Sequence, residues 1–187
     1  MMPPTFEVSL FRRDSNGKTP LKERQRSQAA LLFMMEALCR VNQDILTFEK
    51  RRGNPIPSIY KLGMAYKAEN GTENWQDIYR NIELRDGDCE DLACHRVAEL
   101  RVNGIKAAPF VTYRERGGAY YYHALCAVMT PNGWRIEDPS RKLGMGWGKM
   151  FAGVRYSPQK LAVLQAKIDK VQRKISPRYF NRLKEVG

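Results

Sequence analysis

The chain has 187 residues, of which 43% are hydrophobic and 10% aromatic, so it has enough apolar material to bury a core, and global disorder is excluded. Its longest apolar runs fall far short of the roughly 20 residues that span a bilayer, and its first residues carry no apolar export signal. The formal net charge is +12, which raises the question of nucleic-acid binding.

The positive charge is concentrated at the C-terminal end. Residues 141–187 hold twelve Lys or Arg and two acidic residues, whereas residues 27–140 hold fourteen basic and fifteen acidic residues. A basic end can bind nucleic acid or an acidic protein surface, or it can be a solvated helix face. Because no zinc-finger spacing, RNP-type aromatic pair or phosphate-binding loop accompanies it, nucleic acid is a secondary hypothesis. No membrane partner is expected.

The first half of the chain predicts an exposed arm, residues 1–20, followed by helices. From Leu21 to about Arg51 there is no Pro or Gly, and apolar residues recur at helical spacing, which predicts one long helix. Residues 58–69 predict a second, short helix, and residues 75–84 show a mixed pattern.

The second half of the chain predicts one helix and then strands. The helix starts near Asp88 and ends before Gly104, a typical residue just past a helix end. Three β-type segments follow, at residues 106–114, 119–129 and 134–137. Helices followed by antiparallel strands indicate an α+β domain, placed at residues 21–150. Residues 151–187 are expected to form a basic helical tail, because apolar residues recur there every three or four positions.

Cys89 is the candidate nucleophile. Four cysteines without an export signal argue for reduced thiols. Asp88 is a suitable N-cap and Asp91, three residues later, can complete a reciprocal cap, which places Cys89 in the first helical turn. There the helix dipole is expected to lower the thiol pKa, and the flanking acids to keep the helix start polar and accessible. The alternative is that Cys89 is a buried structural residue.

His123 is the candidate base. The only other histidine, His95, lies six residues after Cys89 and points about 120° away from it on a helix, so it is expected at the surface or in a second layer. Alternation along the strand puts His123 on the same face as Leu125 and Ala127. The alternative is a histidine that only packs among the neighbouring tyrosines.

Asp138 is the candidate partner of His123. If the hairpin loop near Asn132 holds an even number of residues, Asp138 shares the face of His123, and an odd number would put Glu137 there. We expect a four-residue loop to pair Asp138 with Leu125, and a two-residue loop to pair it with Ala127. The first register brings the carboxylate within diagonal reach of the imidazole. Cys89, His123 and Asp138 would then be nucleophile, base and orienting acid.

These motifs resemble those of the transglutaminase-like superfamily of cysteine proteases and acyltransferases. Gly87-Asp88-Cys89-Glu90-Asp91-Leu92-Ala93 looks like the nucleophile motif of its bacterial cysteine proteinases. The segments 122–124 and 136–141 look like its His and Asp motifs, in the same chain order. The chain is also similar to small proteins encoded among phage and prophage virion genes, through residues 57–66, 75–78 and 138–145. The resemblance covers residues from about 55 to 146.

The resemblance implies a papain-like core, in which the helix that carries the cysteine packs on an antiparallel sheet that carries His and Asp, with added terminal helices. It implies a Cys-His-Asp triad that acts on amide bonds through a thioester, as in proteolysis, deamidation or crosslinking. Gln76 is a candidate second oxyanion donor beside the backbone N–H of Cys89. No cofactor or metal is expected, because the acids near Cys89 lack EF-hand spacing.

Two functions of different classes are therefore open. The first is a cysteine hydrolase, similar to a processing protease for virion proteins, that acts in the host cytoplasm or in the virion and is not Sec-exported. The second is a non-catalytic virion structural or assembly protein with the same fold, whose basic tail docks on a protein or nucleic-acid partner.

Overall fold

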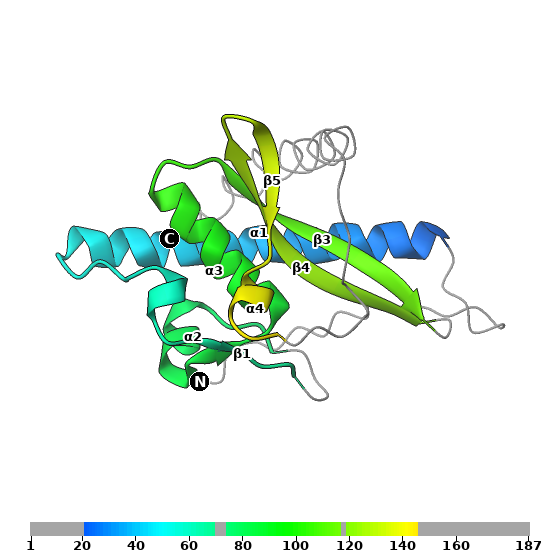
Figure 1. Cartoon of the computed structure of the whole chain (residues 1–187), viewed down its shortest axis with the longest axis horizontal. Helices are drawn as coiled ribbons and strands as arrows, with labels where there is room; N and C mark the ends of the chain where they lie inside the picture. The colour runs from blue at the N-terminus through cyan, green and yellow to red at the C-terminus, as the bar shows by residue number, and fades with distance from the viewer. Residues whose placement is uncertain (1–20, 70–73, 117–118, 146–187) are drawn as a thin grey trace, which may run out of the picture.

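The computed structural model describes residues 21–69, 74–116 and 119–145, which form a mixed α+β fold (Figure 1). The arm predicted for residues 1–20 and the tail predicted for residues 151–187 lie outside the described residues, so the predicted domain boundaries stay predictions. The elements in chain order are α1 (Leu21–Arg51), the 3-10 helix η1 (Ile59–Lys61), β1 (Ala65–Tyr66), α2 (Ile78–Leu84), β2 (Asp86–Gly87), α3 (Cys89–Val102), β3 (Ala107–Arg116), β4 (Ala119–Thr130), β5 (Gly133–Glu137) and α4 (Pro139–Lys142).

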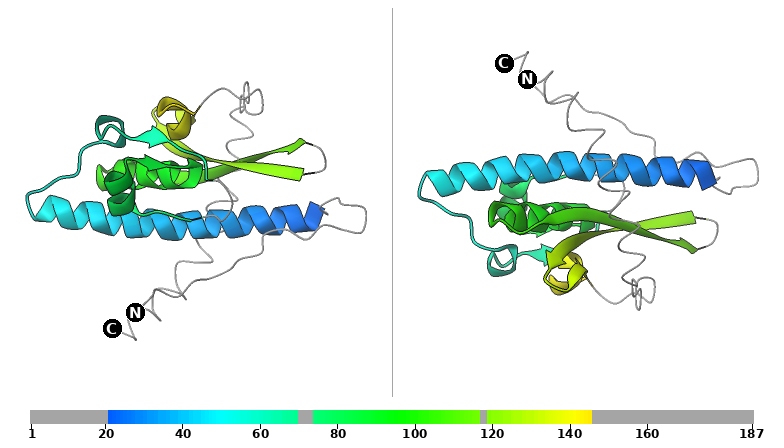
Figure 2. Two further views of the ribbon diagram at one scale, coloured as in Figure 1. Left: turned by 90° about the horizontal axis from the view of Figure 1, so that it is seen from below. Right: turned by 90° about the horizontal axis from the view of Figure 1, so that it is seen from above.

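The elements are stacked so that α3 lies between α1 on one side and β1, η1 and α4 on the other (Figure 2). The main core lies where α1 and α3 meet the sheet. It buries apolar side chains of α1, α3, β3 and β4, namely Met35, Cys39, Ala93, Cys94, Val97, Leu100, Ala107, Val111, Ala124 and Cys126. Thus α3, which starts at Cys89, is packed on the sheet as predicted.

The predicted long helix is confirmed as α1. Four of its buried residues, Met35, Cys39, Asn42 and Leu46, follow one stripe, with the 4, 3, 4 spacing that keeps one helix face inward. The apolar members of this stripe pack on α3 and the sheet.

The sheet has three antiparallel strands in the order β3-β4-β5. Thr130 pairs with Gly133 across a loop of two residues, Pro131 and Asn132, and the last pair is Cys126 with Glu137. Continued by one residue, this register places Asp138 opposite Leu125. Of the two predicted registers, it is the one that brings Asp138 closer to His123. The expectation that this register needs a four-residue loop was wrong, because Gly133 already pairs as a strand residue.

Two predicted segments differ from the structure. Residues 58–69 do not form a helix: η1 is a single 3-10 turn, Gly63 takes a left-handed φ of 67°, and the chain then pairs as β1 with β2 in parallel. A non-local strand pairing thus overrides the local helical pattern. After Asp138 the structure adds α4, for which Asp138 is the N-cap and Pro139 the first residue, a position that suits Pro.

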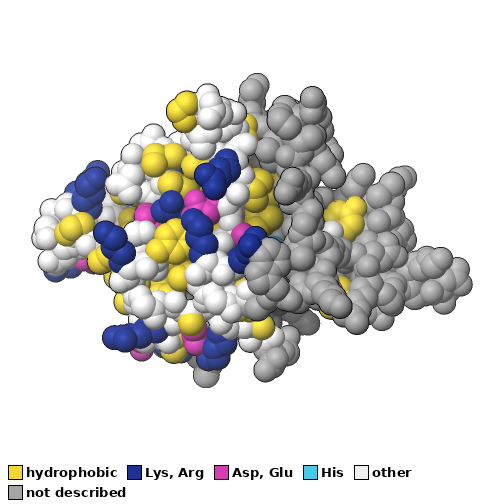
Figure 3. Space-filling model, viewed as in Figure 1, with side chains coloured by type: hydrophobic (Ala, Val, Ile, Leu, Met, Phe, Trp, Pro, Cys, Tyr) yellow, Lys and Arg dark blue, Asp and Glu magenta, His cyan; other side chains and the backbone are white. Residues whose placement is uncertain are grey.

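The described surface carries both signs of charge. On the face shown in Figure 3, basic side chains are scattered, and acidic side chains lie beside several of them. No helix within the described ranges combines the length and the apolar character needed to cross a membrane.

Glu36 and Arg101 join α1 to α3, and we expect the Glu36→Ala variant to lose about 2–4 kcal/mol of unfolding free energy. The two terminal guanidinium nitrogens of Arg101, Nη1 and Nη2, each donate to Glu36 at 2.9 Å, in a largely buried pair. Removal of the carboxylate leaves the cation without its main partner. Urea denaturation measures the loss. The control is Glu83→Ala, in an exposed pair with Arg80, where about 0.5 kcal/mol or less is expected. Equal losses in both variants would contradict the prediction.

Candidate active site

Cys89 is the first residue of α3, and the predicted reciprocal cap positions it. Asp88 is the N-cap, and its backbone N–H donates to the Asp91 carboxylate at 3.3 Å. The second oxygen of Asp91 accepts the backbone N–H of Gln76 at 2.8 Å. One buried carboxylate therefore fixes both the start of α3 and the segment before α2.

Gly87 allows the chain to pack closely just before Cys89. A Cβ at this position would lie 3.0 Å from Asn81 Oδ1 and 3.1 Å from Asp91 Cβ, closer than ordinary contacts allow. Gly87 also pairs with Tyr66 of β1. A side chain at position 87 would push the loop away and move Cys89 with it.

The sulfur of Cys89 lies at the open edge of β4. The backbone N–H of Ala124 donates a hydrogen bond to it, and β5 has already ended at Glu137, opposite Cys126. The sulfur thus lies beside the peptide group that joins His123 to Ala124. In the thiol form it donates to Glu90 Oε2 at 3.2 Å.

His123 and Asp138 are in direct contact. His123 Nε2 lies 3.0 Å from Asp138 Oδ2, and the His123 side chain is 4% exposed. A carboxylate only accepts hydrogen bonds, so in a neutral ring Nε2 carries the proton and Nδ1 is the basic nitrogen. Asp138 Oδ1 accepts the backbone N–H of Arg141 at 3.1 Å, which caps α4. The structure thus brings His123 and Asp138 into contact, and it places the Cys89 sulfur at the backbone of Ala124, the next residue of β4.

The electrostatics of the thiol differ from the expectation. The pKa of Cys89 is raised well above its ordinary value, first by burial and then by the charges of Glu90 and Asp88, while the N–H of Ala124 opposes the shift. The predicted lowering of the thiol pKa was therefore wrong. The flanking acids are themselves buried, since Asp88 and Glu90 are each 8% exposed and Asp91 is fully buried, whereas Cys89 is partly exposed.

Gln76, the candidate oxyanion donor, is 8% exposed. Its backbone N–H is bound by Asp91, two residues after Cys89, and its side-chain oxygen has no hydrogen-bond partner among the described residues. Its role as a donor stays a prediction.

Tyr66 also lies in this region, although no sequence pattern assigns it a role. Burial raises its pKa to about 12, and the next largest contributions are the charges of Cys89 and Asp88, with Asp138 contributing as well. Its backbone N–H donates to the Leu143 carbonyl, just after α4, at 2.8 Å. Tyr66 thus stands between the start of α3 and α4. No local pattern places it there, because β1 meets β2 only in the folded chain.

His95 is buried in the interior, so of its two expected places the surface was wrong and the second layer remains. It is fully buried, and neither ring nitrogen has a hydrogen-bond partner within the described ranges. Burial, with Arg96 nearby, lowers its pKa to about 3. His95 is thus a neutral residue. Nor do the described residues contain a group of three His, Cys, Asp or Glu side chains that could hold a metal ion.

A known family model matches the middle of the chain. Residues 52–139, a little less than half of the chain, match the family model of the transglutaminase-like superfamily core. Among solved structures, the crystal structure of the periplasmic domain of TgpA from Pseudomonas aeruginosa bound to ethylmercury matches 69% of this chain, at 20% sequence identity and a TM-score of 0.34. The chain spans about half (48%) of that solved chain. No curated protein matches.

The Glu90→Gln variant is expected to speed alkylation of Cys89 by iodoacetamide at neutral pH. The amide keeps the shape of the side chain and removes a charge that raises the thiol pKa, so the thiolate fraction should rise several-fold, on the order of 3–10 times. Mass spectrometry separates Cys89 from the three buried cysteines. Glu83→Gln, on the exposed side of α2, should not change the rate. A slower or unchanged rate in Glu90→Gln would show that the charge of Glu90 does not control the thiol.

The buried His95 makes stability depend on pH. The folded chain keeps this imidazole neutral, whereas in the unfolded chain it binds a proton below the ordinary histidine pKa of 6.5. Stability is therefore lost as the pH falls from about 6.5 toward 3. At pH 5 we expect wild type to have lost about 2 kcal/mol more than His95→Leu, relative to pH 7. Thermal or urea unfolding across this range measures the difference, and parallel pH profiles of the two proteins would refute it.

Proposed function

We propose that the protein is a cysteine hydrolase or acyltransferase that acts on amide bonds, with Cys89 as nucleophile, His123 as base and Asp138 as the acid that orients the imidazole. One observation carries the proposal. The thiol in the first turn of α3 bonds the N–H of Ala124, next to a histidine whose far nitrogen is 3.0 Å from a carboxylate. The family match over residues 52–139 supports the same class of chemistry.

The proposed reaction proceeds through a thioester. Nδ1 of His123 takes the thiol proton while the sulfur attacks the amide carbon. The carbonyl oxygen becomes an oxyanion, which the backbone N–H of Cys89 and a second donor, for which Gln76 is the candidate, would stabilise. The intermediate collapses, the C–N bond breaks, and the imidazolium gives its proton to the leaving amine. Water then releases a carboxylic acid, or an acceptor amine forms a new amide, and the thiol is regenerated.

The acids around the thiol require activation by His123. Because burial, Glu90 and Asp88 raise the thiol pKa, little thiolate forms unless a positive charge develops beside it. An imidazolium at His123, stabilised by Asp138, would supply that charge. In this proposal the thiolate is therefore formed together with the imidazolium as a pair.

The narrower part of the proposal is a role similar to a processing protease that acts on virion proteins, in the host cytoplasm or in the virion. It is supported by the likeness of residues 57–66 and 138–145 to small phage-encoded transglutaminase-like proteins. The substrate is then a protein.

The second candidate is a non-catalytic virion structural or assembly protein built on the same fold. The specific observation in its favour is the raised pKa of Cys89, whose proton is donated to Glu90 rather than to an imidazole. In this alternative the basic tail docks on a protein or a nucleic acid. Binding to nucleic acid would weaken steeply with salt.

Alkylation kinetics separate the two candidates without a known substrate. If His123 activates the thiol, His123→Ala should slow alkylation of Cys89 by iodoacetamide at neutral pH by at least about tenfold. In a scaffold whose thiol is not activated, the variant and wild type should react equally. Equal alkylation rates, with circular dichroism showing that both proteins are folded, would overturn the enzyme proposal.

Turnover is tested with casein, by release of peptides and by incorporation of the fluorescent amine dansylcadaverine. Cys89→Ala should abolish both, and Asp138→Asn should lower kcat by about 10²–10⁴-fold, because the imidazole loses its orienting charge. The matched control is Asp44→Asn, the same change at an exposed position on α1. Equal product with wild type and Cys89→Ala would refute the assignment of Cys89.

A further inference from the structure

The placement of Asp138 depends on a short segment of chain. Its Oδ2 contacts His123 and its Oδ1 caps α4, so any shift of α4 moves the imidazole as well. α4 has four residues, Pro139–Lys142, too few for a helix that is stable by itself. Other contacts must therefore fix this segment.

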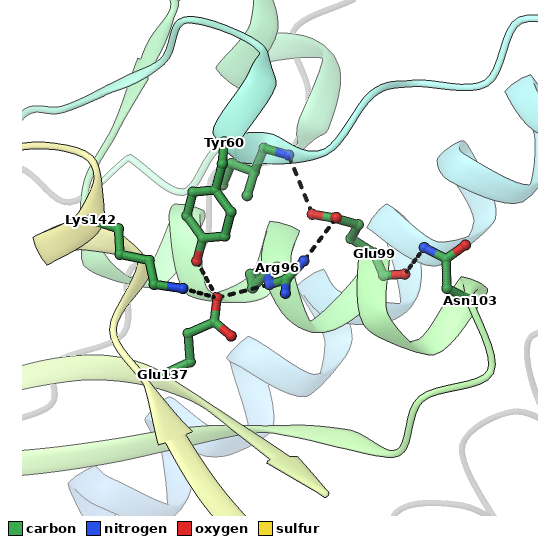
Figure 4. Close-up of polar contacts among 7 residues, drawn as sticks. Tyr60, Arg96, Glu99, Asn103, Glu137 and Lys142 are labelled. Carbon is green, nitrogen blue, oxygen red and sulfur yellow. Dashed lines mark hydrogen bonds and ion pairs between the residues drawn. The ribbon is translucent and has the colours of Figure 1, made fainter. Parts of the chain in front are cut away.

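Those contacts converge on Glu137, the residue before Asp138. Successive side chains of a strand point to opposite faces, so Glu137 is directed away from His123. One oxygen, Oε1, accepts the Tyr60 hydroxyl, Arg96 Nε at 2.9 Å and Lys142 Nζ at 3.1 Å. Figure 4 shows these three side chains directed at the Glu137 carboxylate. Tyr60 lies in η1, Arg96 in α3, and Lys142 is the last residue of α4.

The donors are themselves held in place. Arg96 Nη1 donates to Glu99 at 2.8 Å, and Glu99 accepts the backbone N–H of Ile59 at 3.3 Å (Figure 4). The guanidinium of Arg96 and the ammonium of Lys142 lie 5.2 and 4.6 Å from the centre of the Tyr60 ring. The Glu137 and Arg96 side chains are only 12% and 17% exposed. Two acids and two bases balance, so the cluster is charge-neutral.

The cluster ties Asp138 to the helix that carries the thiol. Cys89 is the first residue of α3, and Arg96 lies seven residues further along it, which is about 10 Å of helix axis. A single α-helix thus holds the thiol at one point and, through Arg96 and Glu137, the segment of Asp138 at another.

We propose that Glu137 is a positioning residue of the active site: bound by Tyr60, Arg96 and Lys142, it fixes Asp138 and through it the orientation of the His123 imidazole. The inference rests on the proposed function, since it assigns a role within the same site. A purely structural role of Glu137 would leave the His123 imidazole unchanged. The proposed role predicts that loss of the Glu137 charge changes the orientation of the His123 imidazole, on the opposite face of the strand.

The test is nuclear magnetic resonance of the ¹⁵N-labelled full-length protein, which reports the tautomer of His123 through its two ring-nitrogen shifts. At about pH 8, where an ordinary imidazole is neutral, His123 of the wild type should be mainly in the Nε2–H form. The Asp138→Asn variant gives the reference ring-nitrogen shifts for a His123 imidazole without its orienting carboxylate. Glu137→Gln should move the shifts by roughly half of that difference, because charge-assisted bonds from Arg96 and Lys142 are weakened. The matched control Glu83→Gln should leave them at wild-type values.

Tyr60→Phe provides a second, milder variant, which removes one donor and keeps the ring, and it should move the shifts in the same direction by less. If both variants are folded and the His123 shifts stay at wild-type values, the proposal is overturned. This readout needs no turnover, so an inactive wild type would count against the proposed function and not against the role of Glu137. If casein is a substrate, Glu137→Gln should lower kcat about tenfold with KM unchanged.

Discussion

The Asp91 carboxylate is the contact on which the site most depends. It is fully buried and accepts the backbone N–H groups of Asp88 and Gln76, so one side chain sets where α3 begins and where the preceding segment lies. Burial raises its pKa to about 7, which indicates that these two hydrogen bonds only partly offset the cost of a charge in the core. The position of the Cys89 sulfur follows from this cap and from the close packing at Gly87.

Two opposite influences act on the Cys89 thiol. The helix start supplies positive potential, which was the basis for expecting a reactive thiolate. The same helix start is largely enclosed and flanked by the carboxylates of Glu90 and Asp88, and burial together with these charges raises the thiol pKa instead. A thiol with a raised pKa is a poor nucleophile until a cation forms beside it and stabilises the thiolate. The charge of the His123–Asp138 pair is therefore as important to the proposed chemistry as the thiol itself.

The parts of the fold that local patterns specify were predictable. α1, α3 and the three strands follow from apolar spacing, from the Asp88–Asp91 cap and from the turn at Pro131-Asn132. The contact between His123 and Asp138 follows from strand alternation. Burial of Asp88, Glu90 and His95 was not predictable, because it depends on how α1, the sheet and β1 enclose α3. Tyr66 and Tyr60 reach the region of the site through non-local contacts that no sequence spacing reveals.

Because Cys89 and Arg96 lie on the same helix, α3, the site tolerates insertions at some positions of the chain and not at others. An extra residue between positions 89 and 96 would turn one end of the helix by about 100° relative to the other, so that the thiol and the anchor of Asp138 could no longer face the same side. An extra residue at the Pro131-Asn132 turn lies at the far end of the β4–β5 ladder, where a wider loop leaves the paired strands in register. Homologous chains built on this plan should therefore vary in length at the hairpin tip while keeping this seven-residue interval constant.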